Sequence, residues 1–288
     1  NAFHPTPRHA GQRPRLTLFN SGGAVHVKLV PLEGRRSVEL ELSLLLILGG
    51  VALLAGFIDT LAGGGGLLTL PALLLAGLNP VNALATNKLQ GTFGSGMATF
   101  MLLRRRRFAE TLAGLRRPFL WSLGGSALGT VLVQLTDSDA LQVLVPVVLA
   151  VIALYFLFSP GAGSVTRAPR LSARLYERTV VPVIGFYDGF FGPGTGSFFS
   201  LTGVALRGQD LITATAQAKA LNFASNIASL TLFVVGGKVL WVTGAVMIVG
   251  QMAGAWLGSH AVLRGGARLI RPLIVIVCLA MLLRYLFG

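Results

Sequence analysis

The amino-acid sequence predicts an all-α polytopic membrane protein with about 8–10 transmembrane or half-membrane helices. Composition is the first observation behind this prediction. Of the 288 residues, 53% are hydrophobic and 12% are charged, about half the roughly 25% charged residues of soluble domains, and the mean hydropathy is +0.72. The second is a series of apolar runs. The third is an internal duplication in which glycine hairpins break the helices at matching places in two repeats.

The apolar runs predict the individual helices, in the order 41–62, 67–78, 80–103, 118–135, 140–158, 179–206, 211–235, 239–259 and 269–287. Runs of about 20 residues are long enough to cross a hydrocarbon core of about 30 Å as α-helices. The run at 67–78 is shorter than this, so it predicts a half-crossing or a broken helix.

The net charge of +14 is concentrated between the apolar runs, in arginine clusters at 104–117, 167–178 and 264–271. This is the pattern of cytoplasmic loops under the positive-inside rule. A basic face for nucleic acid would not be divided in this way, so we expect no nucleic-acid partner. The acidic loop at 137–139 then falls on the outer side, and the protein is expected to be a multi-pass protein of the cell (inner or plasma) membrane.

Four segments follow from this pattern. Residues 1–40 contain several Pro, Gly, Arg and His residues and predict a loosely ordered N-terminal tail. Residues 41–160 form a first membrane repeat, 161–178 a basic loop, and 179–288 a second membrane repeat.

The two repeats are recognised by three pairs of matching segments. They are Gly56–Asp59 with Gly185–Asp188, Gly63–Gly66 with Gly192–Gly196, and Ala85–Lys88 with Ala216–Lys219. Duplicated, glycine-interrupted apolar segments are typical of secondary transporters whose site lies where the repeats meet. If each hairpin joins two full crossings, the second repeat is inverted, which we favour. Re-entrant hairpins would change this count and leave a parallel arrangement open.

Four charged residues, Asp59, Lys88, Asp188 and Lys219, fall within or beside apolar runs. A charge near the bilayer centre costs roughly 2.5–3.5 kcal/mol, so something must offset it. One interpretation is structural, with the aspartates pairing with the lysines or capping broken helices. The other is that Asp59 or Asp188 gains and loses a proton and couples transport to a proton gradient.

The glycine hairpins predict an anion site, because they leave unpaired N–H groups at the start of the next half-helix. The lysines would add positive charge, and nearby amides and hydroxyls would bind several oxygens of one small anion. The candidate residues are Gly63, Gly64, Gly65, Gly66, Thr86, Asn87, Lys88, Gln90, Gly192, Gly194, Thr195, Gly196, Gln217, Lys219, Asn222 and Asn226. The alternative is that the glycines and amides only pack helices together.

At these hairpins the sequence resembles the sulfite exporter TauE/SafE family, also called the four-transmembrane-type sulfite and organosulfur permeases. The resemblance rests on Gly56–Pro71, Gly77–Lys88 and the string GFYDGFFGPGTGSFF at 185–199. It implies a permease for sulfite, sulfonates or related small organic anions, with no bound cofactor. Family members differ in substrate and in direction, so the resemblance fixes neither.

An intramembrane enzyme and a passive channel are the alternatives to a carrier. Intramembrane aspartyl proteases require Gly-x-Gly-Asp, whereas Asp188 here follows Gly185-Phe186-Tyr187, so we expect a protein that is not an enzyme. All four histidines are expected in the tail or a loop, and Cys278 is the only cysteine, so no metal site is predicted. A passive anion channel would use the same polar lining, but duplicated broken helices favour a carrier. The sequence leaves the oligomeric state open.

Overall fold

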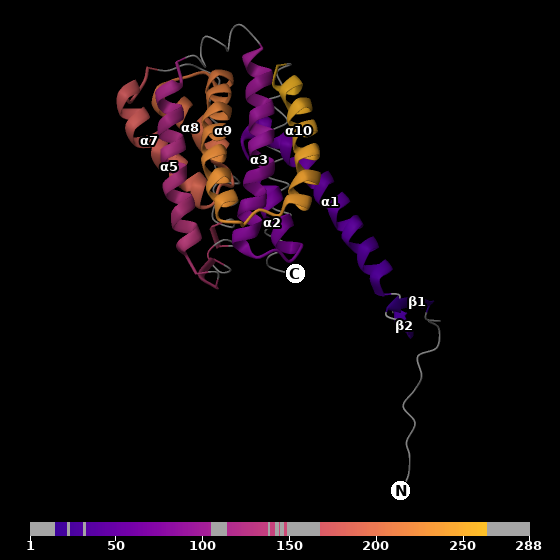
Figure 1. Cartoon of the computed structure of the whole chain (residues 1–288). Helices are drawn as coiled ribbons and strands as arrows, with labels where there is room; N and C mark the ends of the chain where they lie inside the picture. Colours follow the sequence, from indigo (N-terminus) through magenta and orange to yellow (C-terminus); the bar gives the residue numbers. More distant parts are fainter. Residues whose placement is uncertain are drawn as a thin grey trace, which may run out of the picture. The chain divides into compact units, whose positions relative to one another are not determined.

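The computed structural model describes residues 15–21, 24–30, 33–104, 114–137, 139–141, 144, 147–148 and 168–263 (Figure 1). The chain divides into two compact units, Asn1–Leu44 and Leu45–Gly288. The expected crossing at 269–287 and most of that at 140–158 lie outside the described residues.

The first unit contains an antiparallel hairpin of β1 (Arg15–Ser21) and β2 (Ala24–Val30). Its register pairs Arg15 with Val30 and Ser21 with Ala24. The stretch 1–40, expected to be loosely ordered, therefore includes two paired strands. It also includes the first turns of helix α1, which begins at Glu33.

The rest of the described chain is helical, which confirms the prediction of an all-α membrane protein. The helices are α1 (Glu33–Ala62), α2 (Gly66–Leu75), α3 (Pro80–Leu103), α5 (Arg116–Leu135), α7 (Ala173–Phe190), α8 (Thr195–Arg207), α9 (Leu211–Val235) and α10 (Trp241–Leu263). Helix α7 begins inside the stretch 161–178, which we expected to be a loop. His260, also expected in a loop, lies in the last turn of α10.

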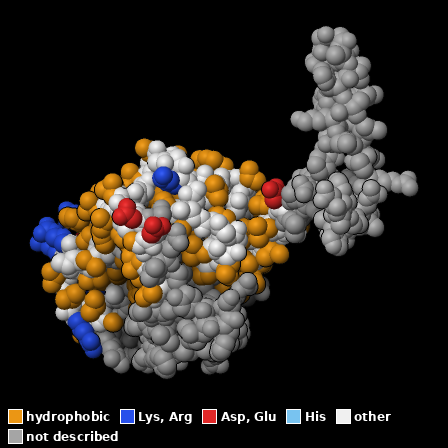
Figure 2. Space-filling view, turned by 90° about the horizontal axis from the view of Figure 1, so that it is seen from below, with side chains coloured by type: hydrophobic (Ala, Val, Ile, Leu, Met, Phe, Trp, Pro, Cys, Tyr) orange, Lys and Arg blue, Asp and Glu red, His pale blue; other side chains and the backbone are white. Residues whose placement is uncertain are grey.

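Four described segments are long and apolar enough to cross a membrane, namely Glu41–Ala62, Arg116–Leu135, Leu211–Val235 and Trp241–Ala261. The described surface carries many exposed hydrophobic side chains, such as Leu128, Val183 and Val249, and few charged ones (Figure 2). Soluble proteins rarely expose apolar surface on this scale, and lipid covers it without cost.

Helix starts follow local sequence signals. Asn79 caps α3 by accepting a hydrogen bond from Val81 N at 3.0 Å, with Pro80 at the first helical position. In the second repeat, Asp210 caps α9 by accepting from Thr213 N at 3.0 Å. The short helix α2 ends at Leu75, as the short apolar run predicted.

Helices α3 and α9 occupy corresponding places in the two repeats, and they run antiparallel (Figure 1). Near the start of α3, Thr86 Oγ1 accepts from Leu240 N, just beyond the end of α9. Near the end of α3, Leu102 packs on Ala216, near the start of α9. Equivalent helices of opposite direction are what an inverted repeat produces.

In each repeat, one helix packs mainly against helices of the other repeat. Helix α5 of the first repeat packs on α7 and α9 of the second, whereas α10 of the second packs on α3 of the first. Helix α10 also lies against α1. A Cβ placed on Gly258 would lie 2.8 Å from the Phe57 carbonyl oxygen, and one on Gly129 would overlap the Phe186 carbonyl oxygen. These contacts are equivalent by the repeat, and small residues allow them.

Hydroxyl groups hold α5 against α9. Ser126 Oγ donates to the Ser225 carbonyl oxygen at 2.6 Å and lies 2.6 Å from Ser229 Oγ. Thr130 Oγ1 donates to Ser229 Oγ at 2.8 Å. Buried hydroxyls that bind across helices are a common means of association in lipid, so this cluster is structural.

Candidate anion site at the crossing of the two hairpins

Each repeat contains a glycine turn that joins a long helix to a shorter one. The first turn lies between α1 and α2, and the second between α7 and α8. Gly63 has a φ of 77° in the first turn, and Gly192 has a φ of 95° in the second. Residues that carry a Cβ rarely adopt this left-handed backbone conformation. Glycine at these positions therefore lets each helix end and the next one begin.

The two turns meet backbone to backbone. A Cβ on Gly63 would overlap the backbone of Gly196 and Ser197, and a Cβ on Gly196 would lie 2.7 Å from Gly63 Cα. Ser197 Oγ donates a hydrogen bond to the Ala62 carbonyl oxygen. The glycine runs therefore provide the close contact between repeats as well as the helix breaks.

Two buried ion pairs cross between the repeats. Lys88 Nζ of α3 lies 2.7 Å from Asp188 Oδ1 of α7. Lys219 Nζ of α9 lies 2.9 Å from Asp59 Oδ2 of α1. Both lysines and Asp188 are 1% exposed, and Asp59 is 8% exposed. Each lysine thus neutralises the aspartate of the other repeat, and the four charges sum to zero.

The ion pair of Asp59 and Lys219 has additional contacts. Asp59 Oδ1 accepts from Gly65 N at 3.2 Å. Lys219 Nζ donates to the backbone carbonyl oxygen of Asp59 as well as to its carboxylate. This lysine therefore binds the last turn of α1 at two points.

Amide side chains line up beside the charges. In the first repeat, Asn87 Oδ1 accepts from Thr69 Oγ1 at 2.5 Å and from Gln90 Nε2 at 2.9 Å. In the second repeat, Asn226 Nδ2 donates to Asn222 Oδ1 at 2.8 Å. Each repeat thus contributes one hydrogen-bonded group of polar side chains.

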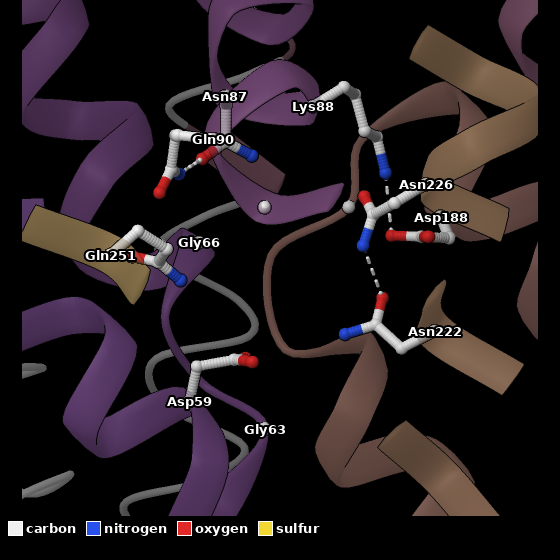
Figure 3. A pocket seen from close by; sticks show the side chains of 12 residues that line it. Asp59, Gly63, Gly66, Asn87, Lys88, Gln90, Asp188, Asn222, Asn226 and Gln251 are labelled. Carbon is white, nitrogen blue, oxygen red and sulfur yellow. Dashed lines mark hydrogen bonds and ion pairs between the residues drawn. The ribbon is translucent and has the colours of Figure 1, made fainter. Parts of the chain in front are cut away.

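A cavity lies between these groups (Figure 3). Its volume is about 30 Å³, which exceeds the roughly 10–15 Å³ that a cavity needs to hold one water. It is therefore large enough for water. Its lining consists of Asp59, Gly63, Gly66, Asn87, Lys88, Gln90, Gly91, Asp188, Gly192, Asn222, Asn226 and Gln251.

Half of the candidate anion-site residues named from sequence border this cavity, as do both candidate proton-coupling aspartates. Those that do are Gly63, Gly66, Asn87, Lys88, Gln90, Gly192, Asn222 and Asn226, together with Asp59 and Asp188. Those that do not are Gly64, Gly65, Thr86, Gly194, Thr195, Gly196, Gln217 and Lys219.

Several residues outside the lining have structural contacts instead. Gln217 Oε1 accepts from Gln209 Nε2 at 2.9 Å. Thr195 Oγ1 donates to the Gly192 carbonyl oxygen at 2.7 Å and so closes the second turn. Gly194, with a φ of 80°, precedes the first residue of α8.

Sequence reasoning missed Gln251 and Gly91. Gln251 lies on α10, the helix of the second repeat that packs on α3 of the first, and it is 2% exposed. A Cβ on Gly94 of α3 would lie 2.5 Å from Gln251 Cγ, so that glycine makes space for the glutamine. The available signal was that a primary amide interrupts the apolar run at 239–259.

Three buried side-chain atoms have no hydrogen-bond partner among the described residues, and all belong to residues that line the cavity. They are Gln90 Oε1, Asp188 Oδ2 and Gln251 Oε1. All three are acceptors. Buried polar atoms normally find partners, so each of these acceptors would be stabilised by a hydrogen-bond donor or a proton.

Comparison with known proteins finds one family and several membrane transporters that resemble this chain. Residues 48–285 match the family model described as "Sulfite exporter TauE/SafE". The chain is 48% identical over 245 residues to the "Probable membrane transporter protein YfcA" of Escherichia coli (strain K12), covering 85% of this chain and 90% of that protein.

Two further relatives are similar over almost their whole length. A "Probable membrane transporter protein" of Haemophilus influenzae is 46% identical over 251 residues, which cover 87% of this chain and 98% of that protein. "Probable membrane transporter protein ORF9" of Sinorhizobium sp is 45% identical over 248 residues, which cover 86% and 94%. No solved structure matches the chain.

Proposed function

Because the chain belongs to the sulfite exporter TauE/SafE family of membrane transporters, we propose that it is a secondary carrier of small anions. Candidate solutes are sulfite, sulfonates and related organic anions. Its place would be the inner or plasma membrane, and its transport would be coupled to protons. The observation that carries the proposal is the cavity at the crossing of two inverted hairpins, which places the buried Lys88 ammonium beside glycine backbone.

The chemistry of the lining supports an anion as the solute. Lys88 supplies a positive charge, and Asn87, Asn222 and Asn226 supply amide groups that donate as well as accept. The hairpin glycines expose backbone where a solute oxygen can approach closely. Because the cavity volume is only about 30 Å³, the cavity suits a small solute better than a large one.

The crossing itself favours a carrier over an open channel. The backbones of Gly63 and Gly196 are so close that a single Cβ does not fit between them. A solute can pass this point only when the helices move, which is the requirement of alternating access around a fixed site. A channel instead keeps a continuous polar path.

Charge balance supports proton coupling. The four buried charges are already neutral as two ion pairs, so a bare anion would leave an uncompensated negative charge in a medium of low dielectric constant. Protonation of Asp59 or Asp188 would cancel it. An intramembrane protease is disfavoured, because its two carboxyl groups would share a proton, whereas here each carboxylate binds a lysine.

Transport by purified protein in liposomes tests the proposal. Sulfite, methanesulfonate and acetate would be offered with and without an imposed proton gradient, and protein-free liposomes would correct for passive permeation. We expect saturable uptake of at least one anion and counterflow of the labelled anion against unlabelled anion. Exposed Lys238→Ala is the matched control for lysine removal. Absence of uptake for all three anions, or flux without saturation or counterflow, would contradict a carrier of small anions.

A further inference from the structure

The two ion pairs are equivalent by the repeat, but their surroundings differ. Resting on the proposed function, we infer that the Lys88–Asp188 pair opens to bind the anion and one proton, whereas the Asp59–Lys219 pair stays closed and fastens the hairpin crossing. The transported anion then binds Lys88, and the transported proton binds Asp188 Oδ2.

The Asp59–Lys219 pair uses its hydrogen-bonding groups within the protein. Asp59 Oδ1 binds Gly65 N, Asp59 Oδ2 binds Lys219 Nζ, and the same ammonium binds the Asp59 carbonyl oxygen. Lys219 does not line the cavity. A Cβ on Gly196 would lie 3.3 Å from Lys219 Nζ, so the lysine sits directly against the crossing point. These contacts join α1, the first turn and α9 into one fixed unit.

Both residues of the Lys88–Asp188 pair keep hydrogen-bonding groups that no described residue uses. Lys88 Nζ donates to one acceptor within the described residues, Asp188 Oδ1 at 2.7 Å, and an ammonium carries three N–H donors. Asp188 Oδ2 is buried and has no donor there. Both residues line the cavity. A Cβ on Gly192 would lie 2.8 Å from Lys88 Nζ, so any larger residue at that turn would press on the ammonium.

The exchange balances in charge and in atoms. A hydronium ion on the loading side breaks one O–H bond, gives its proton to Asp188 Oδ2 and becomes water. The hydrogen bond from Lys88 to Asp188 then breaks. The anion then accepts hydrogen bonds from Lys88, and no covalent bond of the anion changes. The cavity holds the same net charge before and after loading, and release on the other side reverses each step.

The ionisable groups around Asp188 are few. Lys88 of α3 contacts it directly. Tyr187, its neighbour on α7, donates its hydroxyl to the Pro193 carbonyl oxygen at 2.5 Å. Lys219 is the only ionisable residue of α9, and it binds Asp59. Helices α5 and α8 carry theirs only at the ends, in Arg116, Arg117 and Arg207.

Matched substitutions distinguish the two pairs. Asp188→Asn and Asp59→Asn would be compared with the exposed control Asp139→Asn. The probe is labelled methanesulfonate, a monoanion across the working pH range, with labelled sulfite in parallel. The readouts are steady-state accumulation under a gradient of one pH unit and the melting temperature in detergent. One pH unit corresponds to about tenfold accumulation for one proton per monoanion.

We expect about tenfold accumulation by the wild type and by Asp139→Asn, and none by Asp188→Asn, whose interior-to-exterior ratio should be about one. Asp59→Asn should show a lower melting temperature and slower uptake but reach about tenfold. Loss of accumulation in Asp59→Asn with retention in Asp188→Asn would overturn the inference, as would equal loss in both. Wild-type protein that transports neither probe, and acetate no better, would overturn the proposed function itself, and the inference with it.

Discussion

The ammonium of Lys88 lies 2.7 Å from the carboxylate of Asp188, and the two residues come from different repeats, 100 positions apart in the chain. The second pair, Lys219 and Asp59, joins the repeats in the opposite sense across 160 positions. Neither repeat can neutralise its own buried charges in this arrangement, so the two halves are electrostatically dependent on each other.

Removing one partner of a buried pair should destabilise the protein more than removing both. Lys88→Ala leaves Asp188 buried and uncompensated, so we expect a loss of about 3–5 kcal/mol of stability. The double variant Lys88→Ala with Asp188→Ala should recover part of this loss. Denaturation in detergent micelles measures it, with Lys238→Ala as the exposed control. A single variant as stable as that control would show that the pair is not buried in the membrane.

The crossing of the hairpins should be intolerant of a single methyl group. Gly63→Ala introduces both a strained φ and an overlap with the Gly196 backbone, so transport should be lost and the melting temperature lowered. Gly77→Ala is the matched control, because Gly77 has a φ of 84° but no atom within 4 Å of the added Cβ.

The control therefore measures strain alone, expected to cost about 1–2 kcal/mol. Equal effects of the two substitutions on transport and melting temperature would mean that the contact between hairpins does not matter.

Gln251 should affect solute binding more than folding. Its Oε1 has no partner among the described residues, so Gln251→Leu removes no hydrogen bond at that atom, and stability should change by less than about 1.5 kcal/mol. If the amide contacts the solute, the KM of anion uptake should rise severalfold. Gln134→Leu on α5, which lies outside the cavity lining, is the control. An unchanged KM in Gln251→Leu would remove this residue from the site.

The antiparallel course of α3 and α9 predicts which cysteine pairs can be cross-linked. In a Cys278→Ser background, Leu102→Cys with Ala216→Cys should form a disulfide or react with a short bifunctional reagent, because these residues pack together. Leu102→Cys with Phe233→Cys should not, since 17 residues of helix place Phe233 about 25 Å along α9 from Ala216. Gel mobility after oxidation reports the result, and the reverse pattern would require parallel repeats.

Local sequence patterns were sufficient for the class of protein and for many parts of the site. Apolar runs of about 20 residues are long enough to cross the hydrocarbon core of a membrane, and the short run at 67–78 correctly predicted the short helix α2. The duplicated glycine turns and the four charges within apolar runs were also visible, because glycine and charge are costly there and stand out. Helices α3 and α9 run in opposite directions, as an inverted arrangement requires, although α2 is too short to be the full crossing on which we favoured inversion.

What the sequence by itself determined is the set of groups that must be buried in this membrane protein. Tertiary structure decided their partners. It paired each lysine with the aspartate of the other repeat, exchanged α5 and α10 between the repeats, and brought Gln251 to the cavity while leaving Lys219 and Gln217 outside its lining. These pairings depend on contacts between residues 100 or more positions apart. No local sequence pattern encodes which of the two equivalent ion pairs has a carboxylate oxygen without a hydrogen-bond donor among the described residues.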